Sequence, residues 1–400
     1  MASLMILGAG LSQRPLYEAA RRLGLTIVGA DPDPKAPAFS LADQAVVCDL
    51  ADVDTLLQFA RCAGIAGALT IAADYPMTAL ARLWSALGLT GPAQQAVQRA
   101  THKGEMRAAF ERAGVPSPLS RCVQSAAALW VEVKRQGGDM IVKPAQSSGG
   151  RGVLRLPPGC DARAAAQAYG HASSFAPDRA SVLVEQYVQG PEYSIESVIF
   201  DGRHQVVAVT DKLTSDAPHC VEIGHHQPAS VSDRQRDALC NVADQAISAL
   251  GIDHAVCHTE AKLTPHGPVV IECAARAGGG FITSHLVPLS TGIDLMDAAI
   301  AIALGHVPSL QARHPGRPVA IRSIIGPPGR ITAAQGVELA ASMEGVVDVQ
   351  LYKHVGDNVA TLQDATARCG HVIAVGADVD TAIACACAAR DAVQIMTHPA

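Results

Sequence analysis

Short apolar runs alternate with helical stretches through the first 92 residues, and this alternation limits the possible folds more than any other feature of the chain. The predicted strands occupy residues 4–8, 26–30, 44–48 and 67–72. Strands that alternate with helices form parallel sheets whose faces are covered by the helices. We therefore expect a Rossmann-like α/β domain over residues 1–92.

The glycine turn after the first predicted strand is close to a dinucleotide-binding turn. It reads Gly8-Ala9-Gly10-Leu11-Ser12-Gln13, and Asp31 follows the next strand at about the distance expected for a residue that binds ribose. Gln13 stands where the third glycine of that motif belongs. Any βαβ unit also needs a tight turn here, so an NAD-dependent oxidoreductase and a purely structural turn both remain open.

The rest of the chain divides into two further predicted units. A helical stretch at 93–113 leads into strands and glycine-rich turns, which we expect to form an α+β unit over 93–310 with a mobile lid at about 120–190. The last 90 residues change to short apolar runs separated by turns, with a final helix at 378–395. This pattern predicts a small, separate α+β domain over 311–400.

Charge and cysteine content exclude several classes of partner. The net charge is -6 and no run of Lys or Arg is present, which argues against a nucleic-acid partner. No signal-peptide pattern and no uncharged apolar segment of ~18 residues occurs, so we expect a cytoplasmic protein without a membrane partner. The 11 cysteines are scattered and odd in number, which is typical of free thiols in a reducing compartment.

A lysine and a glycine-rich run form the first candidate binding site. Lys143 ends an apolar strand, and it is followed by Ser147-Ser148-Gly149-Gly150-Arg151-Gly152. Glycines let backbone N–H groups approach phosphate oxygens, and the lysine adds a positive charge for the same phosphates. The run leads into a strand and lacks Gly-Lys-Ser/Thr, so it is no Walker A loop. A mobile hairpin with a lysine at its rim would also explain it.

An acidic linker between two strands forms the second candidate. It reads Glu185-Gln186-Tyr187-Val188, and a Gly-Pro turn then leads to Glu192. A purine can lie against such a linker, and a carboxylate such as Glu192 suits ribose hydroxyls. A plain hairpin between amphipathic strands is the alternative.

Two glutamates on neighbouring strands form the third candidate. Glu260 and Glu272 lie on strands joined by a tight turn, so they can meet across the sheet. Their mutual repulsion would be relieved by a divalent cation, and Mg²⁺ prefers one or two carboxylates completed by phosphates and water. Arg276 follows with Gly278-Gly279-Gly280, which suits a phosphoryl group and a substrate close to the backbone.

The order of these sites resembles the ATP-grasp superfamily over roughly residues 93–305, with its preceding α/β domain at 1–92. The resemblance implies ATP and Mg²⁺, with Mn²⁺ as a substitute, as cofactors. It assigns the phosphates to Lys103, Lys143 and the loop 147–152, the adenine to Glu185 through Val188, and the ribose to Glu192. It assigns the metal to Glu260 and Glu272, and an acyl phosphate to Arg276. The family often has E-x-N-x-R, and Ala274 replaces that Asn here.

Within the superfamily, two stretches and residues 311–400 resemble the L-amino-acid ligases, which make dipeptides. The stretches are Thr210-Asp211-Lys212-Leu213-Thr214 and Val221-Glu222-Ile223-Gly224-His225. The resemblance implies catalytic or substrate roles for Lys212, Glu222, His225, Arg276, Asp74, Tyr75, Gly279 and Gly280.

The resemblance implies an ATP-dependent carboxylate–amine ligase that forms an amide bond through an acyl phosphate. We expect this amide to be the peptide bond of a dipeptide. The partners of the ligase are a small-molecule carboxylate and amine, and a homodimer is possible among such enzymes. A carboxylase, a purine-biosynthesis ligase, the NAD-dependent oxidoreductase and a non-enzymatic nucleotide-binding subunit are the alternatives.

Overall fold

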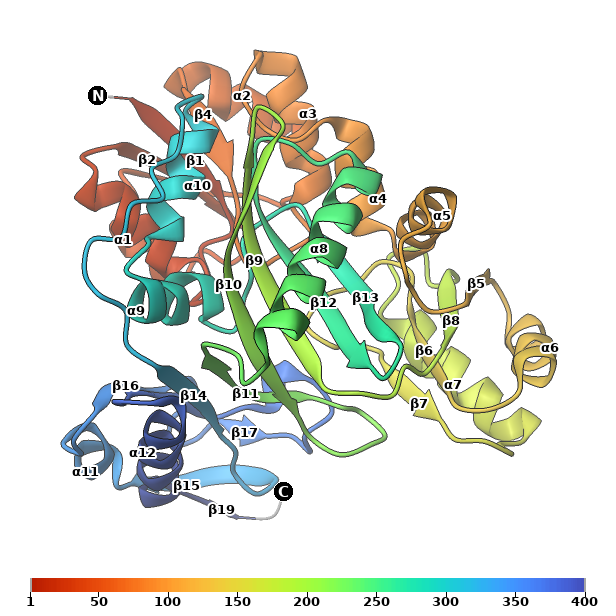
Figure 1. The fold of residues 1–400 in the computed structure, drawn as a ribbon. Coiled ribbons are helices and arrows are strands. Elements are labelled where there is room, and N and C mark those ends of the chain that lie inside the picture. The colour runs from red at the N-terminus through yellow and green to blue at the C-terminus, as the bar shows by residue number, and fades with distance from the viewer. Residues whose placement is uncertain (1, 399–400) are drawn as a thin grey trace.

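The N-terminal part of the computed structural model, which describes residues 2–398, is the expected α/β domain. Its four parallel strands have the order β3-β2-β1-β4, with helices on both faces (Figure 1). The elements are β1 (Ser3–Leu7), α1 (Arg14–Arg22), β2 (Thr26–Asp31), η1 (Pro37–Leu41), β3 (Gln44–Val47), α2 (Val53–Ala63), β4 (Gly67–Leu69) and α3 (Met77–Leu87). The alternation of the sequence thus predicted this domain correctly.

The glycine turn after β1 is filled by its own glutamine. The Gln13 amide donates a hydrogen bond to the Ile71 carbonyl at 2.8 Å, and a Cβ on Gly8 would lie 3.3 Å from the Gln13 side chain. The Asp31 carboxylate accepts a hydrogen bond from the Ala9 N–H at 2.7 Å. These contacts support the structural interpretation of the turn.

Two helices carry the chain to the predicted lid. The expected helical stretch 93–113 is divided into α4 (Gln94–Thr101) and α5 (Lys103–Ala113), because His102 is extended and caps α5 by accepting a hydrogen bond from the Glu105 N–H. This break places Lys103 in the first turn of α5.

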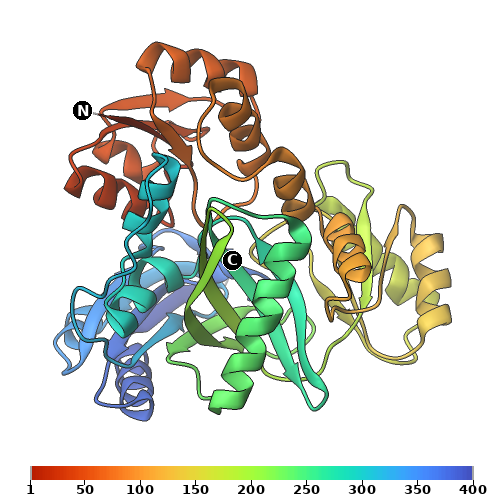
Figure 2. The same cartoon turned by 45° about the horizontal axis from the view of Figure 1, so that its top comes forward.

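The predicted lid is a lobe of its own (Figure 2), with a four-stranded antiparallel sheet in the order β5-β8-β6-β7. Helices α6 and α7 pack together against it around Leu129, Met140 and Ala168. Helix α7, which is rich in alanine, was not predicted from the sequence. The elements are β5 (Ser120–Val123), α6 (Ala126–Gln136), β6 (Met140–Pro144), β7 (Leu154–Leu156), α7 (Ala162–Ser174) and β8 (Val182–Gln186).

An eight-stranded antiparallel sheet forms the centre of the molecule, in the order β13-β12-β9-β10-β11-β14-β18-β16. Its strands are β9 (Glu192–Phe200), β10 (Arg203–Thr214), β11 (Glu222–Gln227), β12 (Ala255–Thr264), β13 (Gly267–Ala274), β14 (Val319–Ile324), β16 (Val346–Leu351) and β18 (Gly370–Val375). Helix α8 (Asp233–Leu250) packs on β12 and β13. The C-terminal residues form the expected small α+β unit, and its strands β14, β18 and β16 extend the central sheet beyond β11.

The connections around this sheet complete the fold. The segment after β13 contains η2 (Ile282–Leu286), α9 (Val287–Thr291) and α10 (Leu295–Ala303), and α10 packs on α1 and β4 of the N-terminal domain. The C-terminal part adds β15 (Gly329–Gln335), α11 (Val337–Ala341), β17 (Asn358–Val359), η3 (Ala365–Ala367), α12 (Val379–Ala392) and β19 (Gln394–His398). The predicted final helix therefore ends at Ala392, and a strand follows that pairs with β15.

No single helix in the described residues is long and apolar enough to cross a membrane. Residues 282–291 and 295–303 reach that length and apolarity only together, across a bend of 119°.

Candidate active site

A cavity of about 390 Å³ lies between the predicted lid, the central sheet and the C-terminal segment around η3. It collects most of the residues that the sequence singled out, although they come from segments far apart in the chain. The predicted residues that line it are Lys103, Lys143, Ser147, Ser148, Gly149, Gly150, Glu185, Gln186, Tyr187, Val188, Glu192, Lys212, Glu222, Glu260, Glu272, Arg276, Gly279 and Gly280.

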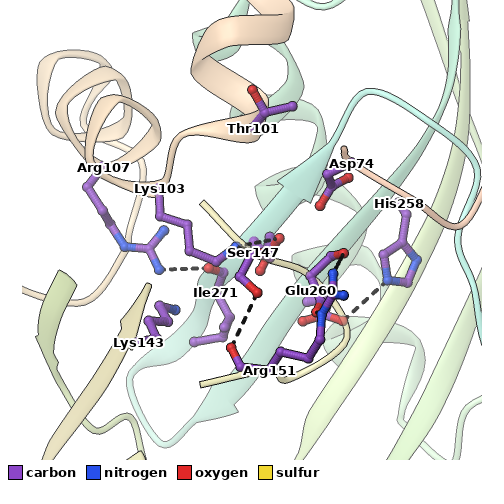
Figure 3. Close-up of polar contacts among 12 residues, drawn as sticks. Asp74, Thr101, Lys103, Arg107, Lys143, Ser147, Arg151, His258, Glu260 and Ile271 are labelled. Atoms are coloured by element: carbon purple, nitrogen blue, oxygen red, sulfur yellow. Dashed lines mark hydrogen bonds and ion pairs between the residues drawn. The ribbon is translucent and has the colours of Figure 1, made fainter. Parts of the chain in front are cut away.

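The glycine-rich loop forms one wall of the cavity. Gly149, Gly150 and Gly152 have φ of 67°, 72° and 76°, a region that favours glycine. The Lys103 ammonium donates a hydrogen bond to the Ser147 carbonyl at 2.7 Å, which ties the loop to the first turn of α5. Figure 3 shows Lys103, Lys143 and Ser147 turned toward the same space.

A buried ionic cluster holds Lys143 beside this loop. The Glu185 carboxylate pairs with the Lys143 ammonium and with the Arg107 guanidinium, whose Nη2 is 3.0 Å away. Burial opposes ionisation of Glu185, but the two cations hold its pKa below the ordinary value. The family resemblance assigned Glu185 to the adenine of ATP, whereas the Glu185 side chain contacts these two cations. Arg107 also donates to the Ile271 carbonyl at 2.7 Å (Figure 3), and the sequence analysis missed it.

Cations surround the tyrosine of the acidic linker. The Tyr187 ring lies 3.9 Å from the Arg155 guanidinium carbon and 4.6 Å from the Lys262 ammonium. Gln186, Tyr187 and Val188 line the cavity beside β6. This linker therefore offers both a flat ring and backbone groups to a ligand.

Lys212 joins two of the predicted carboxylates. Its ammonium lies 2.7 Å from Glu192 Oε1 and 2.7 Å from Glu260 Oε1. Burial alone would lower the pKa of Lys212, but these carboxylates raise it well above the ordinary value. Lys212 is therefore a fixed positive charge between the predicted ribose and metal positions.

The two glutamates predicted to meet across the sheet do so. Glu260 and Glu272 are directly opposite each other in the β12–β13 pair, and Glu272 Oε1 also lies 3.0 Å from the Lys103 ammonium. Both side chains are about 20% exposed toward the cavity. Two carboxylates at an opening suit Mg²⁺, which takes its other ligands from phosphates and water. The described residues hold no cluster of three or more metal-binding side chains, and Ala274 supplies no ligand atom.

His258, on β12, contacts the predicted metal ligand Glu260. His258 Nδ1 lies 2.5 Å from Glu196 Oε1. Its Nε2 lies 3.3 Å from Glu260 Oε1 (Figure 3). Burial would lower the pKa of His258, but Glu196 and Glu260 raise it to about 10. A Cβ at Gly278 would lie 2.6 Å from Nδ1, so this close packing requires glycine. A charged His258 therefore positions Glu260.

The two residues predicted from the end of β4 behave differently. Asp74 Oδ1 accepts a hydrogen bond from Arg276 Nε at 2.8 Å, so Asp74 orients the arginine that lines the cavity. Tyr75 is 56% exposed, and its hydroxyl donates to Asp49 Oδ1 at 2.6 Å. The prediction that Tyr75 lines the pocket was wrong, because its side chain is exposed and bonded to Asp49 and is not among the residues that line the cavity.

The predicted substrate residues form a compact charged group. His225 Nε2 lies 2.9 Å from Glu222 Oε1, and Arg368 Nη1 lies 3.2 Å from the same oxygen. Burial opposes ionisation, but His225 and Arg368 hold the pKa of Glu222 far below its ordinary value. His225 is buried and is not among the residues that line the cavity, but it contacts Glu222, which is. Arg368, on the cavity wall, was not predicted.

Three protein-family models match successive parts of the chain. They are the ribonucleotide synthetase preATP-grasp domain at residues 1–96, the ATP-grasp domain at 137–285, and the L-amino acid ligase C-terminal domain 2 at 322–398.

Several curated proteins are similar to the chain. An uncharacterized protein, y4rH of Sinorhizobium fredii, is 30% identical over 94% of this chain and 78% of its own length. Carnosine synthase 1 of Gallus gallus is 26% identical over 78% of this chain, and alanine–anticapsin ligase of Bacillus subtilis is 26% identical over 57%. These two matches cover only 36% and 52% of the relatives' own lengths.

Two solved structures share the whole fold. An L-amino acid ligase from Bacillus licheniformis matches with a TM-score of 0.86 and 22% identity, over 100% of this chain and 99% of that one. A phosphoribosylglycinamide synthetase from Anaerococcus prevotii matches with a TM-score of 0.78 and 20% identity, over 99% and 100%. At such identities these likenesses concern the fold.

Proposed function

Because this chain belongs to the L-amino-acid ligase branch of the ATP-grasp superfamily, we propose that it joins two amino acids into a dipeptide with hydrolysis of ATP to ADP and phosphate. One observation carries this proposal: Glu222, which contacts His225, and Arg276 line one cavity with Lys103, Lys143 and the glycine-rich loop. Groups suited to an amino acid thus lie beside groups suited to phosphates.

The nucleotide would occupy the side of the cavity between the predicted lid and the central sheet. Lys103, Lys143 and the backbone of the glycine-rich loop would bind the phosphates, and the linker around Tyr187 would border the adenine. Glu260 and Glu272 would hold Mg²⁺, which when bound supplies positive charge for the phosphoryl oxygens. Because Lys103 and Lys212 contact these carboxylates, they would share in that neutralisation.

The acid substrate would be held by its two ends. Glu222 would accept hydrogen bonds from its ammonium, while Arg276, oriented by Asp74, would face its carboxylate. A carboxylate oxygen then attacks the γ-phosphorus, and the bond between that phosphorus and the ADP oxygen breaks. The product is an acyl phosphate, whose charge Arg276 and the two lysines neutralise.

The second amino acid would attack through its amine. Its nitrogen adds to the acyl carbon, inorganic phosphate leaves with the bridging oxygen, and the nitrogen loses a proton. His225, whose Nε2 lies 2.9 Å from Glu222 Oε1, would accept that proton while Glu222 holds the acid substrate. Closure of the predicted lid would exclude water, which would otherwise hydrolyse the acyl phosphate.

The proposal is tested by measuring phosphate release from ATP against a matrix of paired amino acids, with mass spectrometry of the active wells. We expect release that requires two amino acids and yields the mass of a dipeptide. Release supported by bicarbonate, or by a single phosphorylated amine, would instead assign the chain to the carboxylases or purine-biosynthesis ligases.

A further inference from the structure

Arg368 lines the cavity, but the proposed binding of ATP and of the acid substrate gives it no role. It comes from the segment around η3, and its side chain is 19% exposed. The lysines of the same wall pair with the carboxylates assigned to the nucleotide and the metal, and Arg276 pairs with Asp74. Arg368 instead contacts Glu222, on the substrate side.

The backbone holds Arg368 firmly at the edge of the central sheet. The Cys369 N–H donates to the Ile324 carbonyl at 2.8 Å, and the Cys369 carbonyl accepts from the Tyr352 N–H at 2.8 Å. One residue later, β18 begins between β14 and β16. Arg368 therefore projects from a fixed point of the sheet.

The Arg368 guanidinium has a donor nitrogen, Nη2, that is available to a ligand. Nε donates to the Ala365 carbonyl at 3.0 Å and Nη1 to Glu222 at 3.2 Å, whereas Nη2 makes no hydrogen bond to any residue from 2 to 398. A guanidinium presents its donors as a planar fork that matches a carboxylate. Arg368 can thus bind a carboxylate that enters the cavity.

A dipeptide-forming enzyme needs such a group. The amino acid that attacks through its amine keeps a free carboxylate, which becomes the C-terminus of the product. Burying that charge without a partner would be costly. Two extended residues span at most roughly 7 Å. The ammonium of one dipeptide can therefore contact Glu222 while its carboxylate contacts Arg368, once these two side chains have moved apart.

We propose that Arg368 binds the carboxylate of the attacking amino acid and so selects amino acids over other amines. This inference rests on the proposed function. In the absence of substrate, Glu222 and Arg368 neutralise each other. When both substrates are bound, Glu222 holds the ammonium of the acid substrate and Arg368 the carboxylate of the amine substrate.

The test compares two amines in steady-state kinetics with the pair identified by the phosphate-release matrix: the attacking amino acid and its carboxamide, which lacks the charged carboxylate. In Arg368→Ala we expect the KM for the amino acid to rise roughly 10- to 100-fold, the range of a charge-assisted hydrogen bond, while the KM for the carboxamide changes little. Arg368→Lys should restore part of the affinity. Arg330→Ala removes an exposed arginine of the same C-terminal part, whose Nε donates to the Gly356 carbonyl, and is the matched control.

Each other outcome overturns the inference. An equal rise in KM for both amines, or a rise in the KM for the acid substrate alone, would mean that Arg368 only holds Glu222. If the wild-type protein forms no dipeptide with any pair although ATP still raises its melting temperature, the proposed function fails and the inference fails with it. If wild-type and Arg368→Ala prefer the amino acid equally, only the inference fails.

Discussion

Replacing Glu185 by alanine tests the buried ionic cluster beside the phosphate-binding loop. Arg107 and Lys143 are each 5% exposed, and the substitution leaves both cations in the interior without their shared carboxylate. Breaking a buried ion pair on one side costs about 3–5 kcal/mol. With an unfolding entropy of about 2.1 cal/mol/K per residue, a chain of 400 residues should lose about 4–6 °C in melting temperature.

The loss in melting temperature caused by Glu185→Ala should depend on pH in a defined direction. Burial lowers the pKa of Lys143, so the folded protein releases this proton at a lower pH than the unfolded chain does. The free energy of unfolding therefore rises with pH between the lowered pKa of the folded protein and the ordinary pKa of lysine. The loss of Glu185 removes a carboxylate that opposes this shift. We therefore expect the deficit in melting temperature of Glu185→Ala to be larger at pH 6 than at pH 9.

Differential scanning calorimetry across this pH range measures both effects. Glu18→Ala is the matched control, because Glu18 pairs with Arg14 at the surface and such pairs contribute about 0–1 kcal/mol. A Glu185→Ala protein that melts within a degree of this control would refute the reasoning. A deficit that grows toward pH 9 would refute its electrostatic part.

Three further changes have defined outcomes. Gly280 has φ of +61°, and a Cβ there would lie 2.7 Å from Glu222 Oε1, so Gly280→Ala should raise the KM for the acid substrate; an unchanged KM would contradict the placement of that substrate. ATP should raise the melting temperature of the wild type only with Mg²⁺ present, and Glu272→Gln or a chelator should remove most of this rise; a full rise in the variant would exclude Glu272 as a metal ligand. The hydrogen bond from His371 holds the pKa of Asp348 below its ordinary value. The contact therefore stabilises the fold at pH values above the ordinary pKa of aspartate, and this stabilisation is lost as the pH falls below it. Asp348→Asn should therefore melt below the wild type at pH 7, with a gap that narrows below about pH 4; a constant gap would argue against the ionic contact.

Local chemistry made much of the fold and of the site predictable. The N-terminal domain follows from strands and helices that alternate along the chain. A tight turn pairs β12 with β13 as expected, and a shift in register between Glu260 and Ala261 then sets Glu260 opposite Glu272. Lys143 and the glycine-rich loop share one stretch of sequence, so their joint presence at the cavity needed no long-range information.

The contacts that the sequence analysis missed join residues far apart in the chain. Arg107 pairs with Glu185, His258 with Glu196, and Arg368 with Glu222, across separations of 78, 62 and 146 residues. Such pairs are set by tertiary packing, which no local pattern encodes.

Strand partners and side-chain directions were equally hidden. The short apolar runs of the C-terminal part fit any sheet, so their union with the central sheet could not be read from their pattern. Tyr75 follows Asp74 directly, yet Asp74 contacts Arg276 at the cavity whereas Tyr75 contacts the exposed Asp49.

The central claim is that the acid substrate is activated as an acyl phosphate, and transfer of an isotope tests it most directly. The acid substrate of an active pair is supplied with ¹⁸O in its carboxylate, and the released phosphate is analysed by mass spectrometry. The account predicts one ¹⁸O atom in each phosphate released with a dipeptide, because the bridging oxygen leaves with phosphorus. Dipeptide formation with unlabelled phosphate would contradict it.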